Sequence, residues 1–292
     1  MGTLLPLLAA ACGGSAQGDG REPSTGGAAS LGGGTGATTV AGAGGQGDGT
    51  GCNPVSFEDP VVEAAVRDEV GNASDPLTAE QVEQVTELAV AGATSLSGVE
   101  CLTSLRVVTI SASEIQSLLP LLGCPVDFLA VDYSSAPYEE VGELSTLRTL
   151  LLVGPEVTDI GFVASLPLLE DLSLYRASVT DIAAAAKLLR LQSFSARESP
   201  VSDISALSSL SELRSVFLNG SDVSSLAPLD RPPPVLISGC AEIQVLDTNL
   251  DATTLDVTIP HLCELGWYVQ WTGSPSDPNA LWCGPEYCSV EQ

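Results

Sequence analysis

Residues 144–160 (LSTLRTLLLVGPEVTDI) and residues 166–182 (LPLLEDLSLYRASVTDI) can be written one above the other with the same apolar positions filled. In each stretch, leucines lie six and three residues before a pair of leucines at i and i+2, and a Val-Thr-Asp-Ile motif follows. Apolar side chains at i and i+2 on one face are typical of a short β-strand. The two stretches are therefore successive copies of one structural unit.

The same pattern extends over about residues 85–229, where seven copies align with strand pairs 20, 21, 21, 22, 22 and 22 residues apart. The pairs are Leu88/Val90, Val108/Ile110, Leu129/Val131, Leu150/Leu152, Leu172/Leu174, Phe194/Ala196 and Val216/Leu218. Repetition at this period predicts a solenoid, in which the strands of successive coils lie side by side and bury a shared core. An amphipathic helical array is the alternative, but helical spacing would not repeat i, i+2 pairs beside Thr/Ser-Asp turns.

This repeat resembles the leucine-rich repeat of roughly 22 residues found in internalins and similar bacterial surface proteins. The resemblance implies an α/β solenoid, a right-handed coil with short parallel strands, a helical N-terminal cap and an irregular C-terminal cap. In that family an asparagine follows the first strand leucine by five residues. Here the equivalent positions hold Ala93, Ser113, Ser134, Pro155, Ala177, Ser199 and Ser221. We expect serine hydroxyls or water to bond some of the buried backbone groups that the asparagines would otherwise satisfy.

Composition divides the chain into segments. We interpret residues 1–11 as a signal peptide, 12–51 as a disordered Gly/Ala/Ser-rich tether, 52–84 as the helical N-terminal cap, 85–238 as the repeats and 239–292 as the C-terminal cap and tail. In the N-terminal cap, Asp59 is expected to cap a helix that begins at Pro60, and Thr78-Ala-Glu-Gln81 is typical of a capping box. In the C-terminal cap, Trp282 is expected to cover the open end of the core.

The sequence Ala9-Ala-Ala-Cys12 resembles a bacterial lipobox, which implies lipidation of Cys12. Two details depart from the motif: no Lys or Arg precedes Arg21, and Leu8 lies four residues before the cysteine instead of three. The resemblance implies a lipid-anchored protein of the outer membrane or cell surface, and plain secretion stays open as an alternative.

The chain has eight cysteines, and an exported protein is expected to oxidise most of those that are not lipidated. Cys283 and Cys288 are close in sequence and are predicted to pair. Cys240 and Cys263, like Cys101 and Cys124, are 23 residues apart, about one coil, and are also predicted to pair. A bond between Cys52 and Cys101 competes with the last of these.

Charge narrows the classes of partner, because Lys and Arg number 10 against 37 Asp and Glu, for a net charge of −27. Such a chain repels the phosphates of nucleic acids and the anionic headgroups of membranes. We therefore expect no nucleic-acid partner, and membrane contact only through the lipid anchor.

The sequence contains no set of residues that indicates catalysis. His261 is the only histidine, so no nucleophile, base and orienting group can be assembled. No C-x-x-C pair is present for a structural zinc site, and we predict no cofactor and no metal.

The concave face of the strands is the remaining candidate site, because exposed apolar and aromatic side chains on one surface often mark protein interfaces. Phe128, Leu151, Val153, Tyr175 and Phe217 are expected to form an apolar band across neighbouring coils. The predicted partner-binding residues are Phe128, Asp132, Leu151, Val153, Asp171, Tyr175, Arg197, Phe217 and Asn219. The sequence thus predicts a non-enzymatic, protein-binding lipoprotein. A structural spacer or adhesion element without a discrete ligand, and an enzyme using the C-terminal region, are the alternatives.

Overall fold

The computed structural model describes residues 52–285 except 53, 72–74, 237–238 and 273–279. All described residues belong to one compact unit, residues 47–292. The predicted signal peptide, Cys12, the tether and Cys288 lie outside the described residues.

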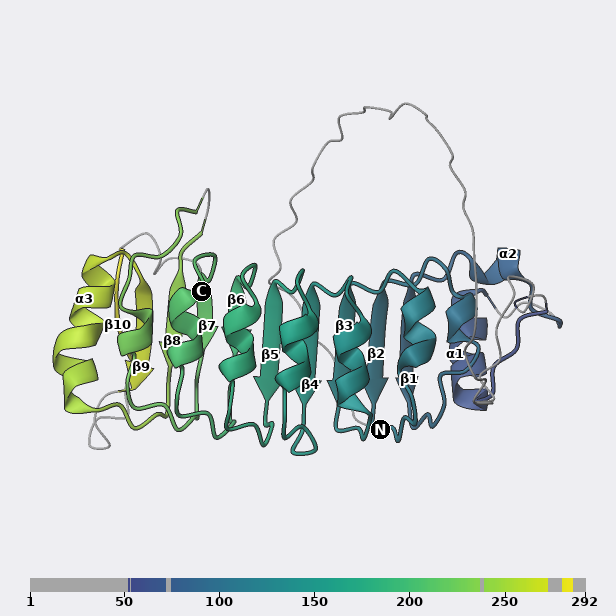
Figure 1. Ribbon diagram of the computed structural model, residues 1–292, viewed down its shortest axis with the longest axis horizontal. Coiled ribbons are helices and arrows are strands. Elements are labelled where there is room, and N and C mark those ends of the chain that lie inside the picture. Colours follow the sequence, from purple (N-terminus) through teal and green to yellow (C-terminus); the bar gives the residue numbers. More distant parts are fainter. Residues whose placement is uncertain (1–51, 53, 72–74, 237–238, 273–279, 286–292) are drawn as a thin grey trace, which may run out of the picture. The chain divides into compact units, whose positions relative to one another are not determined.

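The described unit is a stack of coils with one ten-stranded sheet running through it, and its strands are hydrogen-bonded in chain order (Figure 1). The strands are β1 Glu87–Ala91, β2 Val107–Ser111, β3 Phe128–Asp132, β4 Thr149–Val153, β5 Asp171–Tyr175, β6 Ser193–Ser195, β7 Ser215–Phe217, β8 Glu242–Val245, β9 Tyr268–Thr272 and β10 Ala280–Cys283. Neighbours are parallel from β1 to β9, and β10 is antiparallel to β9. The predicted strand pairs lie opposite one another, as Leu150 does with Leu172, so the solenoid is confirmed.

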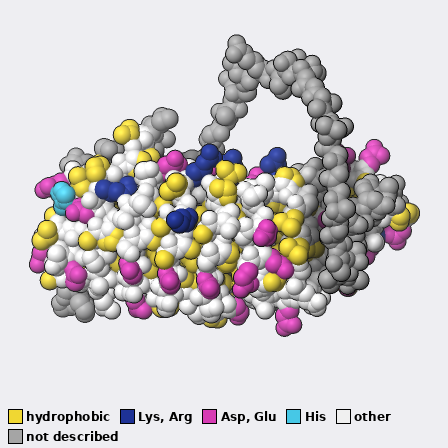
Figure 2. Space-filling view, in the orientation of Figure 1, with side chains coloured by type: hydrophobic (Ala, Val, Ile, Leu, Met, Phe, Trp, Pro, Cys, Tyr) yellow, Lys and Arg dark blue, Asp and Glu magenta, His cyan; other side chains and the backbone are white. Residues whose placement is uncertain are grey.

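Short helical turns return the chain from one strand to the next and cover the other side of the coils (Figure 1). The 3₁₀ turns are η1 Val99–Cys101, η2 Leu119–Gly123, η3 Tyr138–Glu143, η4 Gly161–Ser165, η5 Ala183–Lys187, η6 Ser205–Ser209 and η7 Ala227–Leu229. The aspartates of the Thr/Ser-Asp motifs lie just before η4, η5 and η6. Asp159, Asp181 and Asp203 each accept a hydrogen bond from the backbone N–H two residues later, at 2.7–2.8 Å. Figure 2 shows acidic side chains recurring along one margin of this helical face.

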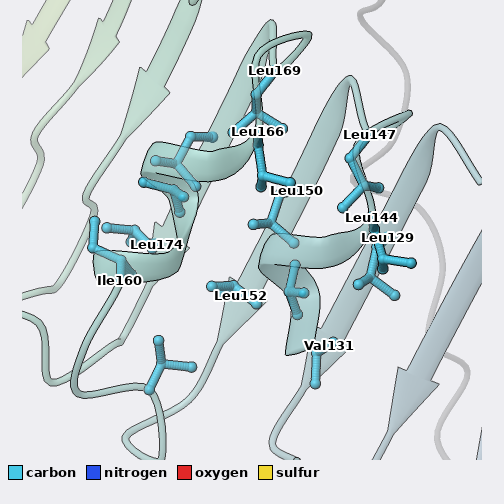
Figure 3. Close-up of a cluster of buried hydrophobic side chains, with 14 of the residues drawn as sticks. Leu129, Val131, Leu144, Leu147, Leu150, Leu152, Ile160, Leu166, Leu169 and Leu174 are labelled. Atoms are coloured by element: carbon cyan, nitrogen blue, oxygen red, sulfur yellow. The ribbon is translucent and has the colours of Figure 1, made fainter. Parts of the chain in front are cut away.

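The core of each coil is built from the positions that define the repeat (Figure 3). Leu144, Leu147, Leu150 and Leu152 point into the coil from the turn and the strand, and none is more than 3% exposed. The following coil supplies Leu166, Leu169 and Leu174 to the same interior. Because no coil can cover these side chains alone, stacking creates a single continuous core.

Buried serines connect successive coils where the related family carries asparagine. Serine Oγ atoms accept backbone N–H groups of the preceding coil: Ser113 from Gly92 and Ala93 (both 3.1 Å), Ser134 from Ser113 (3.0 Å), and Ser199 from Ala177 (3.1 Å). At Ser221 the bond is local, from the Val223 N–H at 3.5 Å. The expectation that serine hydroxyls replace the asparagine amides is confirmed at the first three positions.

The predicted N-terminal helices are present. Helix α1 (Pro60–Glu69) has Asp59 as its N-cap, and α2 (Ala79–Val82) begins with the predicted capping box. Asp59 also accepts the Thr94 N–H at 2.7 Å, which joins the cap to the loop after β1.

At the other end, the parallel sheet continues past the predicted limit of the repeats, through β8 and β9. A π-helical turn, η8 (Thr254–Thr258), leads into α3 (Ile259–Glu264), and fully buried Trp267 follows. The expectation for Trp282 is wrong: it lies opposite Gln270 in the sheet, on the side away from the core, and is 51% exposed.

The predicted disulfides are wrong, and the competing pair is present. Cys101, in η1, is bonded to Cys52 of the cap, with a Cα–Cα distance of 5.5 Å. Cys124 points into the core instead, where it is a free thiol that donates to the Val99 carbonyl at 3.3 Å. Cys263 is bonded to Cys283, because β10 pairs with the strand that follows α3 directly.

These bonds exclude the predicted pairs Cys101–Cys124, Cys240–Cys263 and Cys283–Cys288. Cys240 is also disulfide-bonded. A spacing of one coil places two cysteines on neighbouring coils, but it does not determine which way their side chains point. Cys101 is bonded to the cap, whereas Cys124 points into the core.

Candidate protein-binding face

All nine predicted partner-binding residues point away from the core, on the outward side of the strands, which we call the sheet face. They come from alternate positions of β3, β4, β5 and β7 and from the second residue after β6 and after β7: Phe128, Asp132, Leu151, Val153, Asp171, Tyr175, Arg197, Phe217 and Asn219. Each is half-buried. A half-buried side chain on a fixed strand is already ordered, so it loses little conformational freedom on binding.

An apolar strip crosses the middle of this face on β3, β4 and β5. Val153 lies directly opposite Tyr175 on the next strand, and Leu151 is two residues before Val153 on the same side. Phe128 lies on the adjacent strand, opposite Thr149. Phe128, Leu151, Val153 and Tyr175 are the apolar strip.

The predicted band does not continue from this strip to Phe217. Leu151 and Phe217 occupy the same row of the sheet, and Ser173 and Ser195 lie between them in that row. Phe217 instead belongs to a second group on β6–β8, which we call the Arg197 cluster: Arg197, Phe217, Asn219 and Gln244.

In the Arg197 cluster, the guanidinium lies over the Phe217 ring, 4.4 Å from its centroid. Its Nη2 donates to Gln244 Oε1 at 3.3 Å, and Asn219 Nδ2 donates to the same oxygen at 3.3 Å. Arg197 Nε is buried and has no partner among the described residues. Burial lowers the pKa of Arg197, because the charged form is poorly solvated there.

Two aspartates flank the apolar strip. Asp132 lies opposite Val153, and Asp171 lies opposite Thr149 at the other end of β5 from Tyr175. Burial is the largest influence on both carboxyls and raises the pKa of each above its usual range. Both groups therefore lie in surroundings that solvate a negative charge poorly.

A column of left-handed residues forms the rim of the sheet face, one residue in each coil just after the strand. The column holds Gly92, Ala112, Tyr133, Gly154, Arg176, Glu198, Gly220 and Asp247. This conformation favours glycine, and other residues are disfavoured there by about 1–2 kcal/mol. Tyr133, Arg176 and Glu198 nevertheless keep large side chains at φ between 41° and 54°.

These rim side chains bond to one another and to the apolar strip. Arg176 Nε donates to Glu198 Oε2 at 2.7 Å, and the Tyr175 hydroxyl donates to Glu198 Oε1 at 3.0 Å. The Arg176 guanidinium lowers the pKa of Glu198. Tyr133, two coils earlier, lies within electrostatic reach of Arg176 across Gly154, where a Cβ would lie only 3.1 Å from the Tyr133 ring.

Sequence reasoning missed Tyr133, Arg176 and Glu198 because they lie outside the i, i+2 alternation. Glycines at 92, 154 and 220 in the same position of the repeat were the available signal, since they indicate a left-handed turn at the end of each strand.

Catalytic chemistry finds little support in the described part of the chain. His261 is on the surface of α3, where its Nδ1 lies 2.6 Å from Asp230 Oδ1. A shallow depression lies between Tyr138 and Phe162, and His261 does not line it. No group of three or more potential metal ligands occurs among the described residues, and no described helix is long and apolar enough to cross a membrane.

Comparison with solved structures supports the fold. No protein-family model matches the chain, and no curated protein matches it. The structure is similar to that of internalin C2 from Listeria monocytogenes, with a TM-score of 0.63 and 24% sequence identity over 76% of this chain and 97% of that one. It is also similar to internalin InlF from the same organism, with a TM-score of 0.55 and 19% identity over 77% of this chain and 73% of that one. At such identities the likeness concerns the fold alone, and this chain has the leucine-rich repeat fold of the internalin type.

Proposed function

We propose that this chain is a non-enzymatic, protein-binding module of the bacterial cell envelope that docks a partner protein on its sheet face. The observation that carries the proposal is the apolar strip. Leu151, Val153 and Tyr175 are held half-buried on adjacent strands, outside the hydrophobic core of the solenoid. A spacer without a ligand would gain nothing from such a strip, whereas a partner would gain free energy by burying it.

The residue types at the rim support the same function. Tyrosine and arginine are over-represented among the residues that dominate binding energy at protein interfaces. Glu198 pre-orders Tyr175 and Arg176 there, and Tyr133 lies near them. Retaining Tyr133 and Arg176 at left-handed positions, at a cost in backbone energy, is understandable if their side chains contact a partner.

The proposed location rests on disulfide chemistry and on the lipobox-like sequence. The Cys52–Cys101 and Cys263–Cys283 bonds belong to an oxidising compartment outside the cytosol. We propose that Cys12 is lipidated and that residues 12–51 tether the repeats to the membrane. Replacing Cys12 with Ala should release the protein into the medium and abolish metabolic labelling with a fatty acid.

Docking is tested by affinity capture with the full chain and two double variants. Tyr175→Ala with Phe217→Ala removes aromatic surface from the sheet face. As a control, Leu122→Ala with Leu189→Ala removes exposed apolar surface from η2 and from the turn after η5. We expect loss of a specific captured protein with the first pair only, with unchanged circular dichroism for both. Identical capture by all three proteins would refute the proposal.

A further inference from the structure

Most arginines near the sheet face are neutralised by the chain itself, whereas carboxylates on the face are not. Arg106 forms an ion pair with Asp127, and Arg148 with Glu170, where the strands begin. Arg176 forms an ion pair with Glu198 where the strands end. Asp132, Asp171 and Glu242 form no ion pair with any described residue. Arg214 acts on Asp171, and Arg197 on Glu242, only as more distant charges.

The two aspartates lie diagonally across the apolar strip. Asp132 ends β3 and Asp171 begins β5, with β4 between them. With strands about 4.8 Å apart and a rise of about 3.3 Å per residue, their Cα atoms are about 16 Å apart. An extended segment laid across the strip would cover that span in about five residues.

We infer that the partner docks through a basic segment, in which an aromatic or aliphatic side chain lies on the apolar strip and Lys or Arg on either side reaches Asp132 and Asp171. This inference rests on the docking function proposed above and adds the chemistry of the partner. The cations are expected four to six residues apart, about the span of the diagonal.

Charge complementarity supports a basic occupant over an acidic or neutral one. The chain carries a net charge of −27, so a basic segment is attracted at long range and an acidic one is repelled. At close range, burial makes both aspartates poorly solvated, and a partner cation would supply the missing counter-charge. Arg197 does not do so, because it lies over Phe217 and bonds Gln244, in the other cluster.

The test uses a random dodecapeptide library displayed on phage and selected on the immobilised full chain. Peptides that also bind a Leu151→Asp variant are discarded, which leaves those that need the apolar strip. Their affinities are then measured for the wild type, for Asp132→Asn with Asp171→Asn, and for Glu83→Gln with Glu212→Gln. The last pair removes the same charge from exposed positions off the sheet face. Circular dichroism checks that each variant is folded.

We expect the retained peptides to carry Lys or Arg four to six residues apart around an aromatic or aliphatic residue. Their binding should weaken about tenfold in the Asp132/Asp171 double variant, should be unchanged in the control pair, and should fall with added NaCl. Retained peptides that are neutral or acidic, or that bind the double variant equally well, would overturn the basic-segment inference and leave the docking face standing. If no peptide distinguishes Leu151→Asp from the wild type, the docking face itself is refuted.

Discussion

Replacing Asp59 with Ala should weaken the junction between the N-terminal cap and the repeats. The carboxylate of Asp59 accepts the Val61 N–H at 2.8 Å as the N-cap of α1. It also accepts the Thr94 N–H at 2.7 Å, the Thr94 hydroxyl at 3.0 Å and the Ser95 N–H at 3.3 Å, all from the loop after β1. One buried side chain, 5% exposed, therefore holds together a helix and the first coil.

The expected cost can be estimated from these bonds. Loss of an N-cap costs about 1 kcal/mol. Leaving the Thr94 N–H without its charged acceptor costs about 1–3 kcal/mol more. The sum, about 2–4 kcal/mol, corresponds to a lowering of Tm by roughly 5–15 °C in a domain of this size. Because repeats contact only their neighbours, hydrogen exchange should rise first in α1 and β1.

The effect should depend on pH with a definite sign. The Thr94 N–H lowers the pKa of Asp59 below its ordinary value of 3.8. A carboxyl with a lowered pKa stabilises the fold above its ordinary pKa, and this contribution is lost as pH falls through the lower, folded value. The difference between wild type and Asp59→Ala should therefore be full at pH 7 and shrink below about pH 4.

Thermal and urea unfolding followed by circular dichroism measure the difference. Asp68→Ala is the control, because Asp68 is exposed on the same helix and its loss removes the same charge from a strongly acidic chain. If the two variants unfold alike, or if the Asp59→Ala deficit persists unchanged at low pH, the assignment of Asp59 as the junction of cap and repeats is wrong.

Three further predictions concern a hydrogen bond between coils, a disulfide and a buried thiol. Ser199→Ala removes the hydroxyl that accepts the Ala177 N–H, so it should lower the free energy of unfolding by about 1–3 kcal/mol, while exposed Ser178→Ala should change it little; equal effects would refute the serine ladder. Replacing Cys52 and Cys101 with Ser opens a link between residues 49 apart and should cost up to about 4 kcal/mol in urea unfolding, whereas no loss would mean that the cap is held by other contacts. Burial raises the pKa of Cys124 to about 11, so iodoacetamide should leave it unmodified in native buffer at pH 8 and alkylate it in urea, and rapid native modification by mass spectrometry would contradict its place in the core.

The repeat pattern was sufficient to predict which side chains face in and which face out. Alternation within strands has a period of two, so once Leu150 and Leu152 are inside, Leu151 and Val153 must point outward. This is why the whole predicted set lies on one face. The interruption by Ser173 and Ser195 was also readable from the alignment, because both occupy the row of Leu151 and Phe217.

Other features depended on geometry that sequence spacing does not contain. Cys101 and Cys124 are one coil apart, yet one side chain meets the cap and the other enters the core. The strand after the Pro232–Pro234 crossing begins later than the period predicts, since Ile243 follows Val216 by 27 residues. The rim network required knowledge of backbone angles at Tyr133, Arg176 and Glu198, which only the three glycines of that column hinted at.

Photocrosslinking in intact cells shows whether a partner protein docks on the sheet face. A photoreactive amino acid is placed at Val153 on the apolar strip, or at Leu189, which is 65% exposed in the turn between η5 and β6. We expect one discrete crosslinked protein from the Val153 position, lost when Tyr175→Ala is added, and none from the Leu189 position. The same crosslinks from both positions, or none from Val153, would contradict docking on the sheet face.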